Sequence, residues 1–195
     1  NSNNTGISKS RNKALEIARG KYVAILDSDD IWVDEEKLQQ QYDFLEKNPE
    51  YVLVGGAVIT INFNGQEVGH YKNPIIDSMI RKGILLRNPF INSSVMFVRD
   101  VAIKCGGYEN YTVGEDYDLF LKMGQLGMLS NLSDFLVKYR KHDSGITWSR
   151  RVLAAQDHLS IIAKFKNLYP NYLPALVKGY MRLFLAKLMS CDNHI

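Results

Sequence analysis

The most constraining feature of this chain is the alternation of helical and strand-like hydrophobic patterns over its first two-thirds. A helical pattern ending near Gly20 is followed by the apolar run Tyr22–Leu26, a second helical pattern after Asp34 and a second apolar run over 51–62. Such alternation favours an α/β domain over an all-helical or all-β one. Because Tyr22–Leu26 is apolar throughout, we predict a strand that is buried on both faces of a sheet.

Shorter signals complete the predicted element order. The dipeptide Asn64-Gly65 predicts a hairpin, because tight turns of this kind place both residues at positive φ. Helices are also predicted over 75–82, 99–104 and 116–126, and strands over 91–98 and 135–140. The buried faces of the helices after Asp34 and from Asp116 are predicted to carry Leu38, Tyr42 and Leu45, and Leu119, Phe120 and Met123.

Composition excludes several classes of protein. The 195 residues suffice for one ordinary domain, and 46% apolar residues argue against a disordered chain. A formal charge of +3 does not suggest a nucleic-acid binder. Two cysteines are too few for a disulfide framework, so a reducing cytoplasm is the expected compartment. No run reaches the ~18 apolar residues of a membrane span.

The character of the sequence changes near Arg150. The segment 150–195 predicts two helices, broken near Pro170–Pro174, with apolar residues on more than one face and interleaved lysines and arginines. We therefore divide the chain into a domain over 1–149 and a helical segment over 150–195. The helices are expected to pack on the domain or on a second subunit, and the alternative is a basic amphipathic surface on an anionic membrane.

Three carboxylates follow the first predicted strand in the sequence DSDD, at Asp27, Asp29 and Asp30. Ligands of open α/β sheets bind beyond the carboxyl ends of strands, and carboxylates this close repel one another unless a cation neutralises them. Mg²⁺ or Mn²⁺ takes oxygen ligands, often one or two from protein together with phosphate oxygens. The alternative, helix capping in solvent, is favoured for Asp30 alone.

A second acidic group, GEDYD, begins the helix predicted from Asp116. Acids in a first turn are stabilised by the helix dipole, which explains one such residue without any function. The functional interpretation makes Asp116 a general base, although its N-terminal position is expected to lower its pKa and weaken it as a base. Spacing alone does not decide between the two. Arg11 near a helix N-terminus and His142 in YRKHDSG are candidate phosphate or metal contacts.

Four stretches together resemble the family 2 glycosyltransferases of the GT-A fold, a Rossmann-like mixed sheet flanked by helices. They are GISKSRNKALEIARGKYVAILDSDDIW, PFINSSVMFVRD, GGYEN…GEDYDLFLKMGQLG and YRKHDSG, in the family's order from Gly6 to Gly145. The resemblance implies an enzyme that moves a sugar from a nucleotide-diphosphate donor, expected to be a UDP-sugar, to an acceptor hydroxyl with inversion. It also implies Mn²⁺ or Mg²⁺ as cofactor, and a role in polysaccharide or glycoconjugate assembly in bacteria.

On the donor side, the resemblance assigns roles to four matching positions. Asp27 and Asp29 match the DxD motif, the first near the ribose or metal and the second on the metal that bridges the diphosphate. Arg11 matches a position near the nucleotide base. His142 falls where the family often has a histidine contacting the metal or diphosphate.

On the acceptor side, the resemblance makes Asp116 the catalytic base of the ED motif and places Glu115 beside it, near the acceptor. Ser93 and Ser94 fall on the segment that flanks the sugar and acceptor cleft. The expected acceptor is a saccharide or a lipid-linked saccharide. Peripheral contact with the inner face of the cell membrane and a homodimer are further expectations, and no nucleic-acid partner is expected.

The sequence departs from the family at its start. The family's domain normally begins with a strand, a helix and a second strand that reads the base, and none of these precedes Asn1. We therefore expect an N-terminally truncated catalytic domain. The alternative is a non-catalytic fragment or binding module without a complete donor site. A metal-dependent nucleotide hydrolase is disfavoured, because the sequence has neither a P-loop nor a histidine-rich metal motif.

Overall fold

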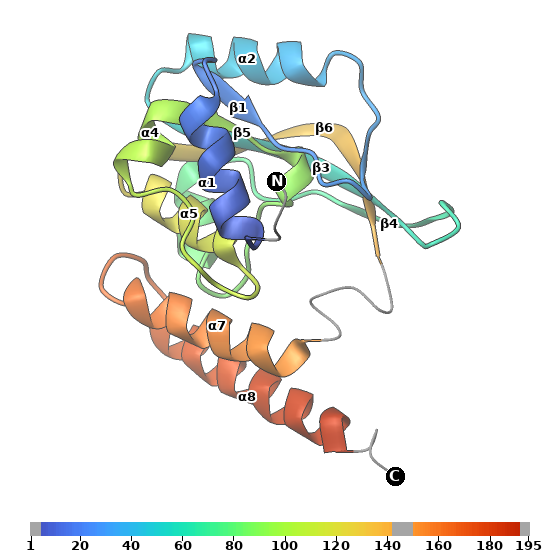
Figure 1. Cartoon of the computed structure of the whole chain (residues 1–195), viewed down its shortest axis with the longest axis vertical. Helices are drawn as coiled ribbons and strands as arrows, with labels where there is room; N and C mark the ends of the chain where they lie inside the picture. The colour runs from blue at the N-terminus through green and yellow to red at the C-terminus, as the bar shows by residue number, and fades with distance from the viewer. Residues whose placement is uncertain (1–4, 142–149, 192–195) are drawn as a thin grey trace.

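The computed structural model describes residues 5–141 and 150–191. It consists of a mixed sheet with helices on both faces, and a hairpin of two long helices lies against one side of this layered domain (Figure 1). The α/β architecture predicted from the alternating hydrophobic patterns is confirmed. No helix within these two ranges combines the length and the apolar character that crossing a membrane requires.

One sheet holds all six strands of the described residues, in the order β1-β5-β3-β6-β2, with β4 paired to the far half of β3. β3 and β6 run parallel, and the other pairings are antiparallel. The strands are β1 Tyr22–Ala24, β2 Ile31–Trp32, β3 Tyr51–Ile61, β4 Glu67–Tyr71, β5 Met96–Val98 and β6 Met128–Arg140.

The helices cover both faces of this sheet (Figure 1). α2 packs on the face that carries Val54 and Met96. The opposite face, with Leu53 and Phe97, is covered by α1, α4 and α5, which contribute Leu15, Ala102 and Phe120 to one core cluster. The helices are α1 Ile7–Ile17, α2 Lys37–Lys47, α3 Asp77–Gly83, the 3-10 turn η1 Asn92–Ser94, α4 Arg99–Lys104, α5 Glu115–Met123, α7 Arg151–Lys164 and α8 Tyr172–Cys191.

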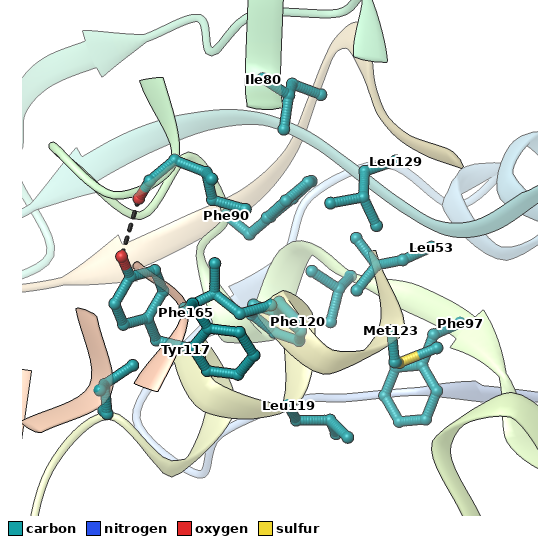
Figure 2. Close-up of a cluster of buried hydrophobic side chains, with 14 of the residues drawn as sticks. Leu53, Ile80, Phe90, Phe97, Tyr117, Leu119, Phe120, Met123, Leu129 and Phe165 are labelled. Carbon is teal, nitrogen blue, oxygen red and sulfur yellow. Dashed lines mark hydrogen bonds between the residues drawn. The ribbon is translucent and has the colours of Figure 1, made fainter. Parts of the chain in front are cut away.

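The larger core lies around α5, as Figure 2 shows. The predicted inward residues Leu119, Phe120 and Met123 are fully buried, which confirms that face of the helix. Tyr117 also points inward, and its hydroxyl donates to the carbonyl of Ile84 at 2.8 Å. Because a buried hydroxyl without a partner is costly, this bond fixes the first turn of α5, which carries the GEDYD acids.

The C-terminal hairpin is part of the same hydrophobic core. α7 and α8 pack along each other, and Ile161, Ile162 and Phe165 are buried in the cluster that contains Phe120. The hydroxyl of Tyr169 donates to the carbonyl of Leu121 at 2.7 Å. The expectation that these helices pack on the domain is therefore confirmed for this face of the hairpin.

Two strand predictions need correction. Tyr22–Leu26 is not buried on both faces, because β1 is an edge strand that pairs with β5 alone among the described residues, and Leu26 is 47% exposed. The last strand begins at Met128 and not at Phe135. Its first half was missed because Ser130 and Asn131 are polar, yet both are buried and donate to the carbonyls of Ile75 and Pro74.

Other local predictions also differ from the structure. The segment predicted as a strand over 91–98 contains the 3-10 turn η1 before β5, and the side chains of Asn92 and Ser93 in this turn bind Asp27 and Asp30 of the loop after β1. The hairpin at Asn64-Gly65 forms, but of these two residues only Gly65 has positive φ, at 82°. The turn is therefore a three-residue type in which glycine takes the left-handed position.

Candidate active site

The loop after β1 is fixed by Asp30, whose side chain is buried. One oxygen of its carboxylate accepts the hydroxyl of Ser93 at 2.5 Å, and the other accepts the backbone N–H of Arg140 at 2.8 Å. The Ser93 hydroxyl oxygen also accepts the N–H of Asp27 at 3.0 Å. Asp30 is thus a support inside the protein and not the exposed capping residue predicted from sequence, since both its oxygens are used to hold the loop.

Asp27 lies at the inner end of the same loop and is partly exposed. Its carboxylate accepts the guanidinium of Arg11 at 2.7 Å and the side-chain amide of Asn92 at 3.0 and 3.1 Å. These donors come from two segments that are far apart in sequence, α1 before β1 and η1 before β5. The carboxylate is therefore held in one orientation at the edge of the domain.

Arg11 connects this loop to the second acidic group. Its other terminal nitrogen donates to Glu115 at 2.5 Å, and its guanidinium carbon lies 5.5 Å from the ring centre of Tyr108. Side-chain exposure is 15% for Arg11 and 8% for Glu115, so this ion pair is largely shielded from water. The two acidic groups of the sequence therefore meet at one cation.

Asp116 follows Glu115 in the first turn of α5. Burial raises its pKa, the nearby carboxylate of Asp27 raises it further, and the guanidinium of Arg11 lowers it. The prediction of a lowered pKa is therefore wrong, because burial outweighs the effect of the helix N-terminus. The pKa of Glu115 is raised by burial and by Asp116, and Arg11 opposes the shift. A carboxylate with a raised pKa is a stronger base.

Tyr139 on β6 lies within electrostatic reach of both acidic groups. Burial is the main cause of the rise in its pKa, and Asp30, Asp29, Asp116 and Asp27 each add to it. The pKa of this one phenol is thus affected by carboxylates of both the DSDD loop and the first turn of α5. Asp29 itself is exposed, and its backbone carbonyl accepts the guanidinium of Arg140 at 3.0 Å.

The remaining predicted site residues have different positions. Ser93 and Ser94 are fully buried, and the Ser94 hydroxyl donates to the carbonyl of Ile91 at 2.7 Å. Asp118, the third acid of GEDYD, points away from Arg11 and pairs with Lys122 and Lys164, each at 2.9 Å. His142 lies outside the described residues.

The oxygen donors at the site suit a hard divalent cation. Asp27 is partly exposed and Asp29 is exposed, two residues apart on one loop, whereas the carboxylate of Asp30 is buried and both its oxygens accept hydrogen bonds from within the protein. Across 5–141 and 150–191, no three histidine, cysteine or acidic side chains form a complete metal cluster. Two carboxylates fit a Mg²⁺ or Mn²⁺ ion that takes its other ligands from a substrate's phosphates and from water.

Several residues of the site were not selected from the sequence. Asn92 and the backbone of Arg140 bind the carboxylates of Asp27 and Asp30, Tyr108 lies against the guanidinium of Arg11, and the acidic side chains add to the rise in the pKa of Tyr139, which burial mainly causes. All four residues fall within motif stretches that carry the family resemblance: PFINSSVMFVRD, GGYEN and YRKHDSG. Their presence in these stretches was the signal that the sequence offered. Their contacts join segments that are far apart in sequence, so these contacts could not be predicted without the fold.

Comparison with known proteins identifies the family. The model of the family named glycosyl transferase family 2 matches residues 1–106, which is more than half of the chain. The amylovoran biosynthesis glycosyltransferase AmsE of Erwinia amylovora is 36% identical over 70% of this chain and 51% of its own length. The O-antigen biosynthesis glycosyltransferase WbnJ of Escherichia coli is 32% identical over 68% of this chain and 52% of its own. The chain thus spans about half the length of these relatives.

A third relative aligns over more of the chain. It is the UDP-Gal:alpha-D-GlcNAc-diphosphoundecaprenol beta-1,3-galactosyltransferase of Escherichia coli, which is 27% identical over 91% of this chain and 70% of its own length. These relatives share an assignment as glycosyltransferases, and two of the three act in polysaccharide or O-antigen biosynthesis.

Solved structures show the same fold. TarS of S. aureus, residues 1–349, has a TM-score of 0.57 and 19% identity, covering 93% of this chain and 52% of TarS. The mannosyltransferase PcManGT of Pyrobaculum calidifontis, solved with GDP-Man and Mn²⁺, has a TM-score of 0.54 and 18% identity, covering 94% of this chain and 53% of that enzyme. The GT-A fold expected from the motifs is confirmed, and with the family match it follows that the chain belongs to glycosyl transferase family 2.

Proposed function

We propose that this chain carries the donor and acceptor carboxylates of an inverting transferase that moves a sugar from a nucleoside-diphosphate donor to an acceptor hydroxyl. The observation that carries the proposal is the meeting of Asp27 and Glu115 at Arg11, with Asp116 beside them. A single displacement requires donor-binding groups on one side of the reacting carbon and one base on the other. These groups belong to the proposed catalytic domain over 1–149, and α7 supports the first turn of α5, where His158 stacks on Tyr117 and Lys164 pairs with Asp118.

Asp116 is the proposed base, and it takes the proton of the attacking acceptor hydroxyl. Its raised pKa supports this role, because a carboxylate with a raised pKa binds the transferred proton more tightly, and its partial exposure leaves it within reach of an acceptor. Glu115 is proposed to orient the acceptor, with its own orientation held by Arg11. Ser93 and Ser94, being buried, are proposed to act through the protein rather than to touch the sugar: Ser93 positions the donor loop, and Ser94 holds the η1 turn through the carbonyl of Ile91.

Asp27 and Asp29 are proposed to face the donor. A UDP-sugar is the proposed donor type, and Mn²⁺ or Mg²⁺, held by Asp29 with Asp27 and His142, would stabilise the negative charge of the leaving diphosphate when bound. Arg11 keeps Asp27 and Glu115 in place, and its position near the proposed nucleotide follows from its contact with Asp27. The GDP-Man and Mn²⁺ of the PcManGT structure support this donor chemistry.

A lipid-linked saccharide is the proposed acceptor, as the diphosphoundecaprenol substrate of the galactosyltransferase supports. We further propose that α8 lies on the inner face of the cell membrane. Its outer face exposes an apolar stripe, which we define as Leu173, Val177, Tyr180, Met181, Phe184, Leu185 and Leu188. Lys178 and Arg182 flank this stripe on one side and Lys187 on the other, as in helices that lie in an anionic interface. A homodimer through the same stripe is the competing arrangement.

The decisive experiment separates donor binding from transfer. A UDP-sugar is titrated with and without Mn²⁺ against the wild type, Asp29→Ala and Asp116→Asn. We expect binding that depends on Mn²⁺ and is lost in Asp29→Ala, whereas Asp116→Asn binds donor and does not transfer. Transfer that survives in Asp116→Asn would remove the assigned base. A wild type that binds no nucleotide sugar would instead indicate a non-catalytic module.

A further inference from the structure

A cavity of about 350 Å³ lies beside the segments that carry the candidate active site, and its floor is one face of β4, β3 and β6. Val58 of β3 pairs with Tyr71 of β4, and Thr60 of β3 pairs with Tyr139 of β6. Residues paired across strands, and alternate residues along a strand, project from the same face of a sheet. These four side chains therefore form a continuous floor with a tyrosine at each side.

Two cations lie over the outer side of this cavity. The guanidinium carbon of Arg87 lies 5.6 Å, and the ammonium nitrogen of Lys141 5.4 Å, from the ring centre of Tyr71. Lys141 also donates to the Tyr71 hydroxyl at 3.5 Å. In the part of the chain that the structure describes, neither cation forms an ion pair with a carboxylate. Two like charges that converge on one ring without a counter-ion favour the arrival of an anion.

A second, independent observation comes from the floor. Thr60 is 1% exposed, and its hydroxyl oxygen has no hydrogen-bond partner among the described residues. A buried hydroxyl without a hydrogen-bond partner destabilises a protein, so its presence beside a cavity suggests that a ligand binds there. A hydroxyl-rich ligand in the cavity would supply the missing partner.

The cavity is connected to the candidate active site through Tyr139 and Ile91. Tyr139 lines the cavity, and the carboxylates of Asp29 and Asp116 add to the rise in its pKa. Ile91 also lines the cavity, and the next residue, Asn92, binds the carboxylate of Asp27. A ligand in the cavity can therefore extend one end toward the loop that carries Asp27, while its other end lies against Arg87 and Lys141.

We propose that this cavity binds a phosphate-bearing saccharide, with Arg87 and Lys141 on the phosphate and the tyrosine rings against the sugar. Charged hydrogen bonds from Arg and Lys are the usual means of holding phosphate, and aromatic rings pack on the apolar faces of sugars. The assignment rests on the proposed function and deepens it, because it makes the acceptor an anionic sugar phosphate. The donor's own diphosphate is proposed to lie at Asp27 and Asp29, which are not among the residues that line the cavity.

Calorimetric titration in the presence of Mn²⁺ with three probes tests this assignment: glucose 1-phosphate, glucose and UDP. The proteins are the wild type, Arg87→Gln, Lys141→Gln and, as a matched control, Lys104→Gln, which changes an exposed lysine on α4 outside the cavity. We expect the wild type to bind glucose 1-phosphate at least about tenfold more tightly than glucose. Each cavity variant should lose about tenfold in affinity for glucose 1-phosphate and less than about twofold for UDP, whereas the control should match the wild type.

Two results would overturn the assignment. One is equal binding of glucose and glucose 1-phosphate by the wild type. The other is a loss of UDP affinity in the cavity variants as large as their loss of glucose 1-phosphate affinity. That result would show that Arg87 and Lys141 bind the donor's phosphates. A wild type that binds glucose 1-phosphate through Arg87 but binds no UDP would instead count against the proposed function alone. Thermal unfolding of each variant, compared with the wild type, shows whether the fold is retained.

Discussion

The backbone N–H of Arg140 donates to the carboxylate of Asp30 at 2.8 Å, which ties the loop after β1 to the end of β6. The same carboxylate accepts the hydroxyl of Ser93, so three segments far apart in sequence are joined at one buried acid. Burial raises the pKa of Asp30, and the two hydrogen bonds oppose that rise. The positions of Asp27 and Asp29 relative to the sheet therefore depend on Asp30.

The first prediction compares Asp30→Ala with Asp29→Ala. Removing the Asp30 carboxylate leaves two buried donors without acceptors, so the free energy of unfolding should fall by about 1–3 kcal/mol. Asp29 is exposed, and its replacement should change that free energy by less than about 0.5 kcal/mol. Denaturant unfolding of both variants measures the difference. Equal stabilities would show that Asp30 does not hold the loop.

The second prediction concerns the cation between the acidic groups. Arg11→Met should lower the free energy of unfolding by about 2–4 kcal/mol, because it leaves the carboxylate of Glu115 buried without its partner. The loss should shrink as the pH falls. Without Arg11 the already raised pKa of Glu115 rises further, so the folded state takes up a proton more readily than the unfolded chain.

The control for this prediction is Lys13→Met on the same helix, because Lys13 is 67% exposed in its side chain. That variant should stay within about 0.5 kcal/mol of the wild type. Urea unfolding near pH 5 and pH 8 gives both comparisons. A loss of stability in Arg11→Met that does not vary with pH would mean that the guanidinium acts through packing and not through charge.

The sequence was informative where hydrophobic periodicity decides the structure. α5 buries Leu119, Phe120 and Met123 as predicted, because apolar side chains at helical spacing share one face of the helix and that face packs into the core. The helix α2 shows the limit of this reasoning. Its buried positions are Lys37, Gln41 and Leu45, and not Leu38 and Tyr42, which are 42% and 45% exposed.

The reason lies in polar partners that the sequence does not reveal. Gln41 donates to the carbonyls of Val54 and Ser94, at 3.0 and 2.8 Å. Lys37 donates to Gln41 and lies 4.4 Å from the ring centre of Trp32, while burial lowers its pKa to about 8. Periodicity assigns such residues to solvent, and only the assembled fold supplies the acceptors that bury them.

The candidate site also contains features that the sequence predicts and features that only the fold reveals. The motif positions Asp27, Glu115 and Asp116 could be selected from sequence, because acids after a strand or at a helix start have recognisable chemistry. That Arg11 joins Asp27 to Glu115 could not, because the contact depends on how α1 and α5 pack on one face of the sheet. The reversal of the pKa shift of Asp116 has the same origin, since burial is a property of the fold.

The third prediction tests the close approach of β3 and β6. A Cβ atom added at Gly55 would lie 2.2 Å from the side-chain oxygen of Asn131, whose amide donates to the carbonyl of Pro74. Gly55→Ala should therefore lower the free energy of unfolding by about 1–3 kcal/mol. Gly83→Ala is the matched control, because nothing lies within 4 Å of a Cβ there. A similar thermal midpoint for the two variants would contradict the packing described for β3.

The fourth prediction concerns the apolar stripe of α8. The protein should sediment with vesicles that contain anionic lipid and less with neutral vesicles, because Lys178, Arg182 and Lys187 flank the stripe. Phe184→Glu should abolish sedimentation, since Phe184 is 63% exposed at the centre of the stripe. Ile103→Glu, at an apolar residue on α4 that is 44% exposed, should leave it unchanged. Dimers in solution without vesicle binding would assign the stripe to a second subunit.

The fifth prediction is a pH dependence of stability from His158 on α7. Its ring stacks on Tyr117 with 5.6 Å between centres, and burial, with Arg182 and Lys178 nearby, lowers its pKa from 6.5 to about 4. Between those two values the unfolded chain binds the proton more readily than the folded protein. The stabilisation from a neutral His158 is thus complete above about pH 6.5 and is lost as the pH falls toward 4.

His158→Phe keeps an aromatic ring against Tyr117 and removes the titrating group. Relative to this variant, the wild type should lose up to about 3 kcal/mol of unfolding free energy between about pH 7 and pH 4. The difference between the two proteins isolates His158 from Asp30, Glu115 and Asp116, whose raised pKa values act in the opposite direction in both. Urea unfolding at several pH values provides the measurement, and a difference that stays constant across them would show that His158 is not held neutral against α5.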